Sequence, residues 1–197
     1  MRKFKRNVLL GLTIGALLAL AAWTQVWFTF DVSEGAAVSQ VTVAGTESRP
    51  FVSALALGTL AAIGALLLAG NVARLLILLV TIGLGVGGVI SASSASQDPI
   101  AASLAPLSAV TGLDDVGTVT AAVTAQTQTA GWIVCSFGFF LIFLSALAGA
   151  VTHRKWQRPT DRFNRPESDA EFRSVKTDHI SDGDSWDSLS RGEDPTR

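Results

Sequence analysis

Residues 75–91 read LLILLVTIGLGVGGVIS and contain no acidic or basic residue and no histidine. Three more stretches share this property, at residues 8–27, 51–69 and 132–151. A bilayer core about 30 Å thick is crossed by roughly 20 apolar residues in a helix that rises ~1.5 Å per residue. The sequence therefore predicts an all-α membrane protein, a four-helix transmembrane bundle within residues 1–151.

The distribution of Lys and Arg predicts the orientation of this bundle. Ten of these residues lie before the first stretch, in the connection 70–74 or in residues 152–165, whereas residues 24–50 contain only Arg49 and residues 92–130 contain none. Basic segments tend to stay on the cytoplasmic side. We therefore expect a multi-pass protein of the plasma membrane, with both termini in the cytoplasm and the segments 24–50 and 92–130 outside.

A cleaved signal peptide is the alternative for the first stretch, because a basic start, an apolar run and Ala19-Leu20-Ala21 fit a cleavage site. The apolar run continues through Trp27 and Phe28, which is longer than a usual signal core. Trp23 and Trp27 also suit an aromatic belt at the outer membrane interface. We favour a retained span.

The first outer segment predicts a small β-hairpin. Within residues 26–32, Val26, Phe28, Phe30 and Val32 fall on one face of an extended strand, and a second alternating run follows at residues 40–43. Such period-two runs, separated by the turn residues Ser33-Glu34-Gly35, are typical of paired strands.

The second outer segment, residues 92–130, predicts one or two short surface helices. Asp98-Pro99 is a typical helix start. After Asp114-Asp115, the residues Val116, Val119 and Val123 keep helical spacing. A helix cap is also the better interpretation of the paired aspartates, because adjacent side chains point apart.

Residues 152–197 predict a cytoplasmic tail that is mostly disordered, because its composition is polar and contains too few apolar residues to form a core. Residues 184–196 differ from the rest of the tail. Within them Trp186 and Leu189 fall on one helical face. We predict that this segment binds a cytoplasmic protein partner through Trp186, Leu189, Arg191, Gly192, Glu193, Asp194, Pro195 and Thr196.

Two pairs of glycines are predicted to let helices approach closely. Gly11 and Gly15, like Gly83 and Gly87, are spaced four residues apart within apolar stretches. Packing within the chain is favoured over dimerisation, and the oligomeric state is not fixed by the sequence. Residues 83–88 also match the dinucleotide-binding pattern G-x-G-x-x-G, but they lie inside an apolar run rather than between a strand and a helix.

No catalytic, cofactor or metal site is predicted. The single cysteine, Cys135, is interpreted as a packing residue, and the two histidines, His153 and His179, are far apart in the sequence. The net charge of −1 gives no general attraction to nucleic acid. We therefore expect a protein that is not an enzyme and whose first partner is the lipid bilayer.

The C-terminal run SWDSLSRGEDPT, residues 185–196, resembles the closing signature of the tryptophan-associated transmembrane proteins of actinobacteria. In that family a Trp and a Leu precede an Arg-Gly-Glu-Asp-Pro-Thr ending. Gln25-Val26-Trp27, residues 41–46 and Trp156 also agree with it. The resemblance implies an association with tryptophan biosynthesis, but it supplies no catalytic or binding residue.

Two functions follow as hypotheses. The first is a non-enzymatic accessory or anchoring role in the membrane. The alternative is a small-solute carrier for an aromatic amino acid or precursor, acting as an oligomer through the glycine faces. Carriers can use hydroxyls and unwound backbone, and the candidate hydroxyls are those of Thr13, Ser53, Thr59, Thr81, Ser136 and Ser145.

Overall fold

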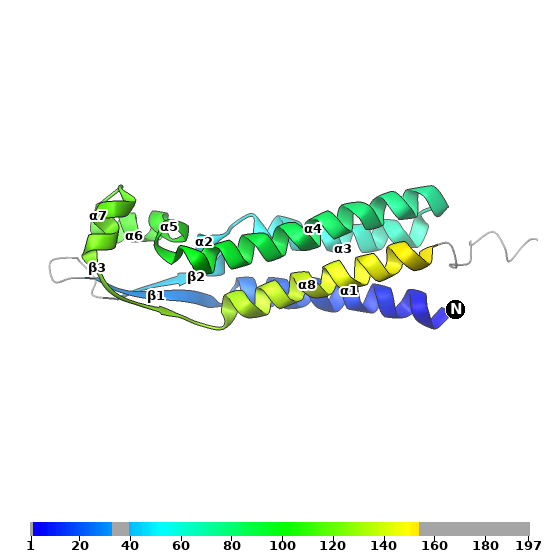
Figure 1. Ribbon diagram of the computed structural model, residues 1–197, viewed down its shortest axis with the longest axis horizontal. Coiled ribbons are helices and arrows are strands. Elements are labelled where there is room, and N and C mark those ends of the chain that lie inside the picture. The colour runs from blue at the N-terminus through cyan, green and yellow to red at the C-terminus, as the bar shows by residue number, and fades with distance from the viewer. Residues whose placement is uncertain (1, 33–39, 154–197) are drawn as a thin grey trace, which may run out of the picture. The chain divides into compact units, whose positions relative to one another are not determined.

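The computed structural model describes residues 2–32 and 40–153, all of which belong to one compact unit of the chain, residues 1–158. Four long helices form a bundle, and a small sheet with short helices lies at one end of it (Figure 1). The long helices are α1 (Arg2–Trp23), α3 (Val52–Leu68), α4 (Asn71–Gln97) and α8 (Gly131–Thr152).

Three of the four predicted apolar stretches form helices long and apolar enough to cross a membrane. These are Phe4–Trp23, Asn71–Gln97 and Gly131–Thr152. The fourth, α3, is apolar but has only 17 residues, which corresponds to about 26 Å of helix. The structure therefore establishes a mostly helical fold with three candidate spans, and the predicted count of four is not settled by helix length.

Each long helix packs against two others, and the most extensive contacts are those of α8 with α1 and with α4. Glycines make these contacts close. A Cβ added to Gly88 of α4 would overlap the ring of Phe139, and one added to Gly15 of α1 would lie 2.7 Å from the carbonyl oxygen of Gly138. Side chains at these positions would force the helices apart.

The predicted hairpin is confirmed but is part of a larger sheet. Strand β1 (Val26–Val32) pairs antiparallel with β2 (Gln40–Ala44) and, along its other edge, with β3 (Val123–Gln128), giving the order β2-β1-β3. The prediction that Val123 continues a helix was wrong. Helix α7 (Val116–Ala122) ends one residue earlier, and β1 offers the following residues an unpaired edge.

The structure has three short helices within residues 92–130 rather than the predicted one or two, and two of them begin where the sequence predicts. The Asp98 carboxylate accepts from Ala101 N at 3.0 Å at the start of α5 (Pro99–Ala102). Asp115 accepts from Thr118 N at 3.1 Å at the start of α7. Between them lies α6 (Leu104–Thr111), which ends at Gly112 with a φ of 71°. Each aspartate satisfies an N–H that the first helical turn leaves without a partner.

An apolar core joins the sheet to these short helices. Phe28 and Phe30 of β1 are fully buried, as are Leu107 of α6 and Val119 of α7. Helix α6 contacts β2, and α7 contacts β3. The alternation in β1 therefore directs Phe28 and Phe30 toward the short helices, and the apolar core of the long helices continues into this end of the molecule.

Candidate functional site

The helices and the sheet meet at a junction made of residues 21–27, Gly45 and residues 129–131. The last turn of α1 leads directly into β1, and Gly45 N donates to Gln25 O at 3.1 Å. Gly45 also begins the one-turn helix α2 (Gly45–Ser48). Segments from three distant parts of the sequence are therefore held together at this point.

Trp27 is the central side chain of the junction. It is fully buried, and its indole N–H donates to Ala22 O at 2.9 Å. A Cβ on Gly45 or on Gly131 would lie 2.6 Å from an atom of its ring. The prediction of a membrane-interface Trp at position 27 was therefore wrong, because two glycines let the chain close around the indole. Trp23 is half-buried and donates to Arg49 O at 2.9 Å.

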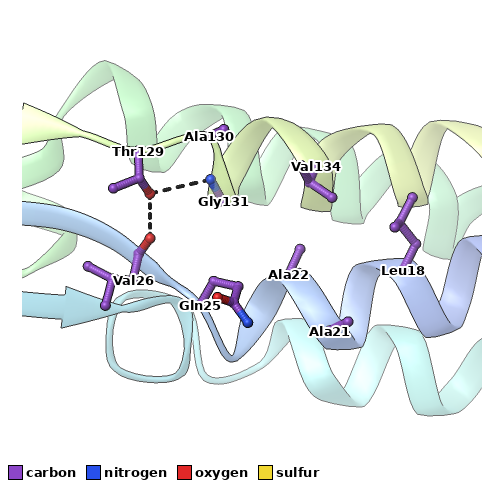
Figure 2. Close-up of a pocket in the computed structure, with 9 residues that line it drawn as sticks. All are labelled: Leu18, Ala21, Ala22, Gln25, Val26, Thr129, Ala130, Gly131 and Val134. Atoms are coloured by element: carbon purple, nitrogen blue, oxygen red, sulfur yellow. Dashed lines mark hydrogen bonds between the residues drawn. The ribbon is translucent and has the colours of Figure 1, made fainter.

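A pocket of about 540 Å³ lies beside this junction, between the ends of α1 and α8. Figure 2 shows Leu18, Ala21 and Ala22 on the α1 side, facing Val134 on α8. The Thr129 hydroxyl lies at the turn into α8, donates to Val26 O and accepts from Gly131 N (Figure 2). The complete lining is Leu18, Ala21, Ala22, Gln25, Val26, Thr129, Ala130, Gly131 and Val134.

The chemistry of this pocket is apolar. Its only side chains with hydrogen-bonding groups are those of Gln25 and Thr129, and none of its lining residues is charged. The volume falls in the range of small-molecule sites, which are typically apolar with a few polar groups. With an uncharged and mostly apolar lining, the pocket is suited to an apolar molecule.

The opposite end of the bundle contains a buried cation. Arg74, in the first turns of α4, is 1% exposed, and its Nη2 donates to Ala69 O at 3.1 Å. His153, which follows α8, is 8% exposed at the same end, where its Nδ1 lies 2.6 Å from Ala150 O. One turn inward, Leu78 packs against Gly149. Arg74 is therefore part of the packed bundle rather than a solvated charge of the connection 70–74.

The two predicted glycine pairs have different surroundings. Gly11 and Gly15 face α8, where a Cβ on Gly11 would overlap the Ser145 side chain. A Cβ on Gly83 or Gly87 would meet no atom of the described chain within 4 Å. The prediction that Gly83 and Gly87 pack within the chain was wrong. Gly85 and Gly88, on the opposite face of α4, contact Phe143 and Phe139 instead.

Five of the six hydroxyls proposed for a carrier are engaged in local hydrogen bonds to the backbone. Those of Thr13, Thr59, Thr81 and Ser136 donate to the carbonyl oxygen four residues earlier, at 2.7 to 3.0 Å. The Ser53 hydroxyl donates to Pro50 O in the same way, at 2.9 Å. Ser145 packs against Gly11. This arrangement gives the carrier hypothesis no support.

The cysteine and the possible metal ligands form no reactive site in the part of the chain that the structure describes. Cys135 is buried, and its Sγ lies 3.8 Å from Ala19 O of α1. Within residues 2–32 and 40–153, no three of the His, Cys, Asp and Glu residues are grouped so that they could hold a metal ion. The eight C-terminal residues predicted to bind a partner, from Trp186 to Thr196, lie outside the described residues.

A comparison with known families adds what the geometry cannot. A family model described as "tryptophan-associated transmembrane protein" matches residues 9–196. The chain belongs to this family. No curated protein and no solved structure matches it. The resemblance inferred from the C-terminal motif is therefore confirmed, and the three candidate spans agree with a transmembrane protein.

The family match spans both the helical part of the chain and the C-terminal segment. It runs from the first apolar helix to Thr196, so residues 184–196 fall within the matched range. The family description names an association with tryptophan and a place in the membrane, and it names no reaction. Sequence reasoning missed the junction around Trp27. The one signal for it was the Gln25-Val26-Trp27 run, which the family resemblance had already singled out.

Proposed function

We propose that this protein is a non-enzymatic accessory or anchoring protein of the plasma membrane, associated with tryptophan biosynthesis. In this proposal the helical bundle fixes the chain in the bilayer, and residues 184–196 bind a cytoplasmic protein. The family match that extends through Thr196 carries the proposal, because it joins this segment to the transmembrane part in one family unit.

The proposed topology has four spans, a retained first helix and both termini in the cytoplasm. Only Ala69 and Gly70 separate α3 from α4, so these helices form a tight hairpin and α3 returns the chain across the bilayer. Helix α1 supports retention, because α8 packs along it at Gly11 and Gly15. The excess of Lys and Arg at the ends of the chain supports the orientation.

In the proposed non-enzymatic role, the acidic side chains of the described residues have structural roles. Asp98 and Asp115 cap short helices, and Glu47 accepts from Ala44 N at 3.3 Å. The pocket beside the junction is lined without a charged group. An accessory role requires none of these groups to react.

A pull-down from cross-linked cells tests the partner-binding segment. The intact chain is compared with a chain ending at Gly183 and with the double variant Trp186→Ala, Leu189→Ala. Ser188→Ala is the matched control, because it lies between these two residues without removing an apolar contact. We expect the first two changes to lose the same captured protein and the control to retain it. Identical captured sets from all four chains would contradict the proposal.

Cysteine labelling tests the topology. The only native cysteine, Cys135, is buried, so Cys135→Ala provides a background without reactive thiols. We expect a membrane-impermeant reagent to label Asp114→Cys in intact cells and to label Arg6→Cys only after the cells are opened. Labelling of Asp114→Cys only in opened cells would reverse the orientation.

A further inference from the structure

Arg49 lies at the end of the bundle where the sheet begins. It is the only Lys or Arg in residues 24–50 and 92–130, and it separates α2 from α3. Its side chain reaches across to α4, where Nε donates to Ser91 O at 3.3 Å and Nη2 donates to Ser94 Oγ at 3.4 Å. A third bond, from Nη1 to Ser48 O at 3.4 Å, holds the guanidinium in this position.

The charge of Arg49 has no carboxylate partner among residues 2–32 and 40–153. A guanidinium has about five N–H donors, so one N–H on Nη1 and one on Nη2 have no acceptor there. The acids on the neighbouring elements are directed elsewhere: Glu47 accepts from Ala44 N and Asp98 accepts from Ala101 N. The guanidinium is therefore held in place, and these two N–H groups are available to an anion.

The protein groups that hold Arg49 are all neutral. Ser48 and Ser91, whose carbonyl oxygens accept from the guanidinium, are buried, at 5% and 6% exposed. The Ser94 hydroxyl, which accepts from Nη2, donates its own hydrogen to Ser91 O at 3.0 Å. None of these groups balances the charge of Arg49.

The surroundings point to a lipid as that ligand. Phe51, which lies two residues after Arg49 and immediately precedes α3, is 53% exposed, and Ile90 on α4 is 61% exposed. Helix α3 is apolar, and α4 is itself a candidate span. The basic group therefore lies where an apolar helix surface meets the sheet end of the bundle, which is the level of a phospholipid headgroup.

We propose that the guanidinium of Arg49 binds the phosphate of an anionic phospholipid. The planar guanidinium matches two phosphate oxygens, and its charge favours a headgroup without a cation of its own. An acyl chain of the same lipid would lie along the exposed apolar faces of α3 and α4. The assignment is independent of the partner-binding role of residues 184–196.

A lipid titration of the purified full chain in detergent tests this site. The thermal unfolding midpoint is measured against phosphatidylglycerol and, separately, against phosphatidylcholine. We expect phosphatidylglycerol to raise the midpoint at lower concentration, and Arg49→Gln to weaken this apparent affinity about tenfold. Arg6→Gln is the matched control, because it removes an exposed charge at the opposite end of α1 and should leave the titration unchanged.

Two further comparisons distinguish an anionic lipid from free phosphate and from a zwitterionic lipid. Arg49→Lys keeps the charge but loses the paired N–H donors of the guanidinium. Its apparent affinity for phosphatidylglycerol should therefore lie between those of wild type and Arg49→Gln. It also replaces Arg49→Gln in the test if that variant does not fold. Equal titrations for wild type and both Arg49 variants would overturn the site. An equal midpoint shift with inorganic phosphate alone, or with phosphatidylcholine, would overturn the assignment to an anionic lipid.

Discussion

The two glycine pairs of this protein have the same spacing and opposite surroundings. Gly11 and Gly15 lie in the contact between α1 and α8, whereas Gly83 and Gly87 lie on a face of α4 that meets no other described residue. On that face Leu79, Val80 and Ile90 are more than half exposed. Spacing therefore shows that two glycines share a helix face, but it does not show what that face contacts.

Adjacent glycines of α4 give the largest expected difference between a packed and an open face. In Gly88→Leu the new side chain would overlap the ring of Phe139, and we expect a loss of about 3 kcal/mol of unfolding free energy from overpacking. Gly87→Leu meets open space and should unfold at or above the wild-type temperature. Thermal unfolding in detergent, followed by circular dichroism, measures both; equal midpoints would break the comparison.

Alanine substitutions should change the free energy of unfolding in opposite directions in the two glycine pairs. Gly15→Ala places a Cβ 2.7 Å from Gly138 O, so we expect a loss of about 2 kcal/mol. Gly83→Ala has no such contact and removes the flexibility of a glycine within a helix, so we expect a gain of up to about 1 kcal/mol. Thermal unfolding of the two alanine variants in detergent tests both expectations. Destabilisation by Gly83→Ala would indicate that this face is occupied, for example by a second copy of the chain.

The junction extends the comparison beyond the bundle. Gly131→Ala places a Cβ 2.6 Å from the ring of Trp27, and we expect a loss of about 1 to 2 kcal/mol, because the indole must shift. Gly112→Ala at the end of α6 has space but a φ of 71°, and it should cost about 1 kcal/mol through backbone strain. Tryptophan fluorescence should shift for Gly131→Ala and not for Gly112→Ala. An unchanged spectrum in both variants would contradict the packing around Trp27.

The smallest expected difference concerns the adjacent aspartates. Asp115→Ala removes the cap of α7 and should cost about 1 kcal/mol. Asp114→Ala removes the same charge without removing that cap, and we expect a change within about 0.5 kcal/mol. Chemical denaturation of the two variants side by side tests the difference. Equal midpoints would mean that α7 does not depend on its cap.

Features set by local sequence could be predicted, and features set by distant contacts could not. The apolar helices, the hairpin of β1 and β2 and the caps at Asp98 and Asp115 follow from periodicity and turn chemistry within a few residues. Strand β3 forms because an edge of β1, more than ninety residues away, is available for pairing.

The burial of Trp27 depends on distant contacts in the same way. It requires Gly45 and Gly131 to meet at one indole, and no local pattern reports such a meeting. Local sequence also does not show whether Gly83 or Gly85 is the packed glycine. Four glycines lie within six residues of α4, so small residues occur on several faces of the helix.

The length of α3 has a consequence for the surrounding bilayer. At 17 residues it is ten residues shorter than its neighbour α4, so a spanning α3 is several ångströms shorter than the ~30 Å of hydrocarbon around it. Such hydrophobic mismatch is relieved by local thinning at a modest cost per ångström. The protein would deform the bilayer on one side only, and it would partition toward thinner membrane regions.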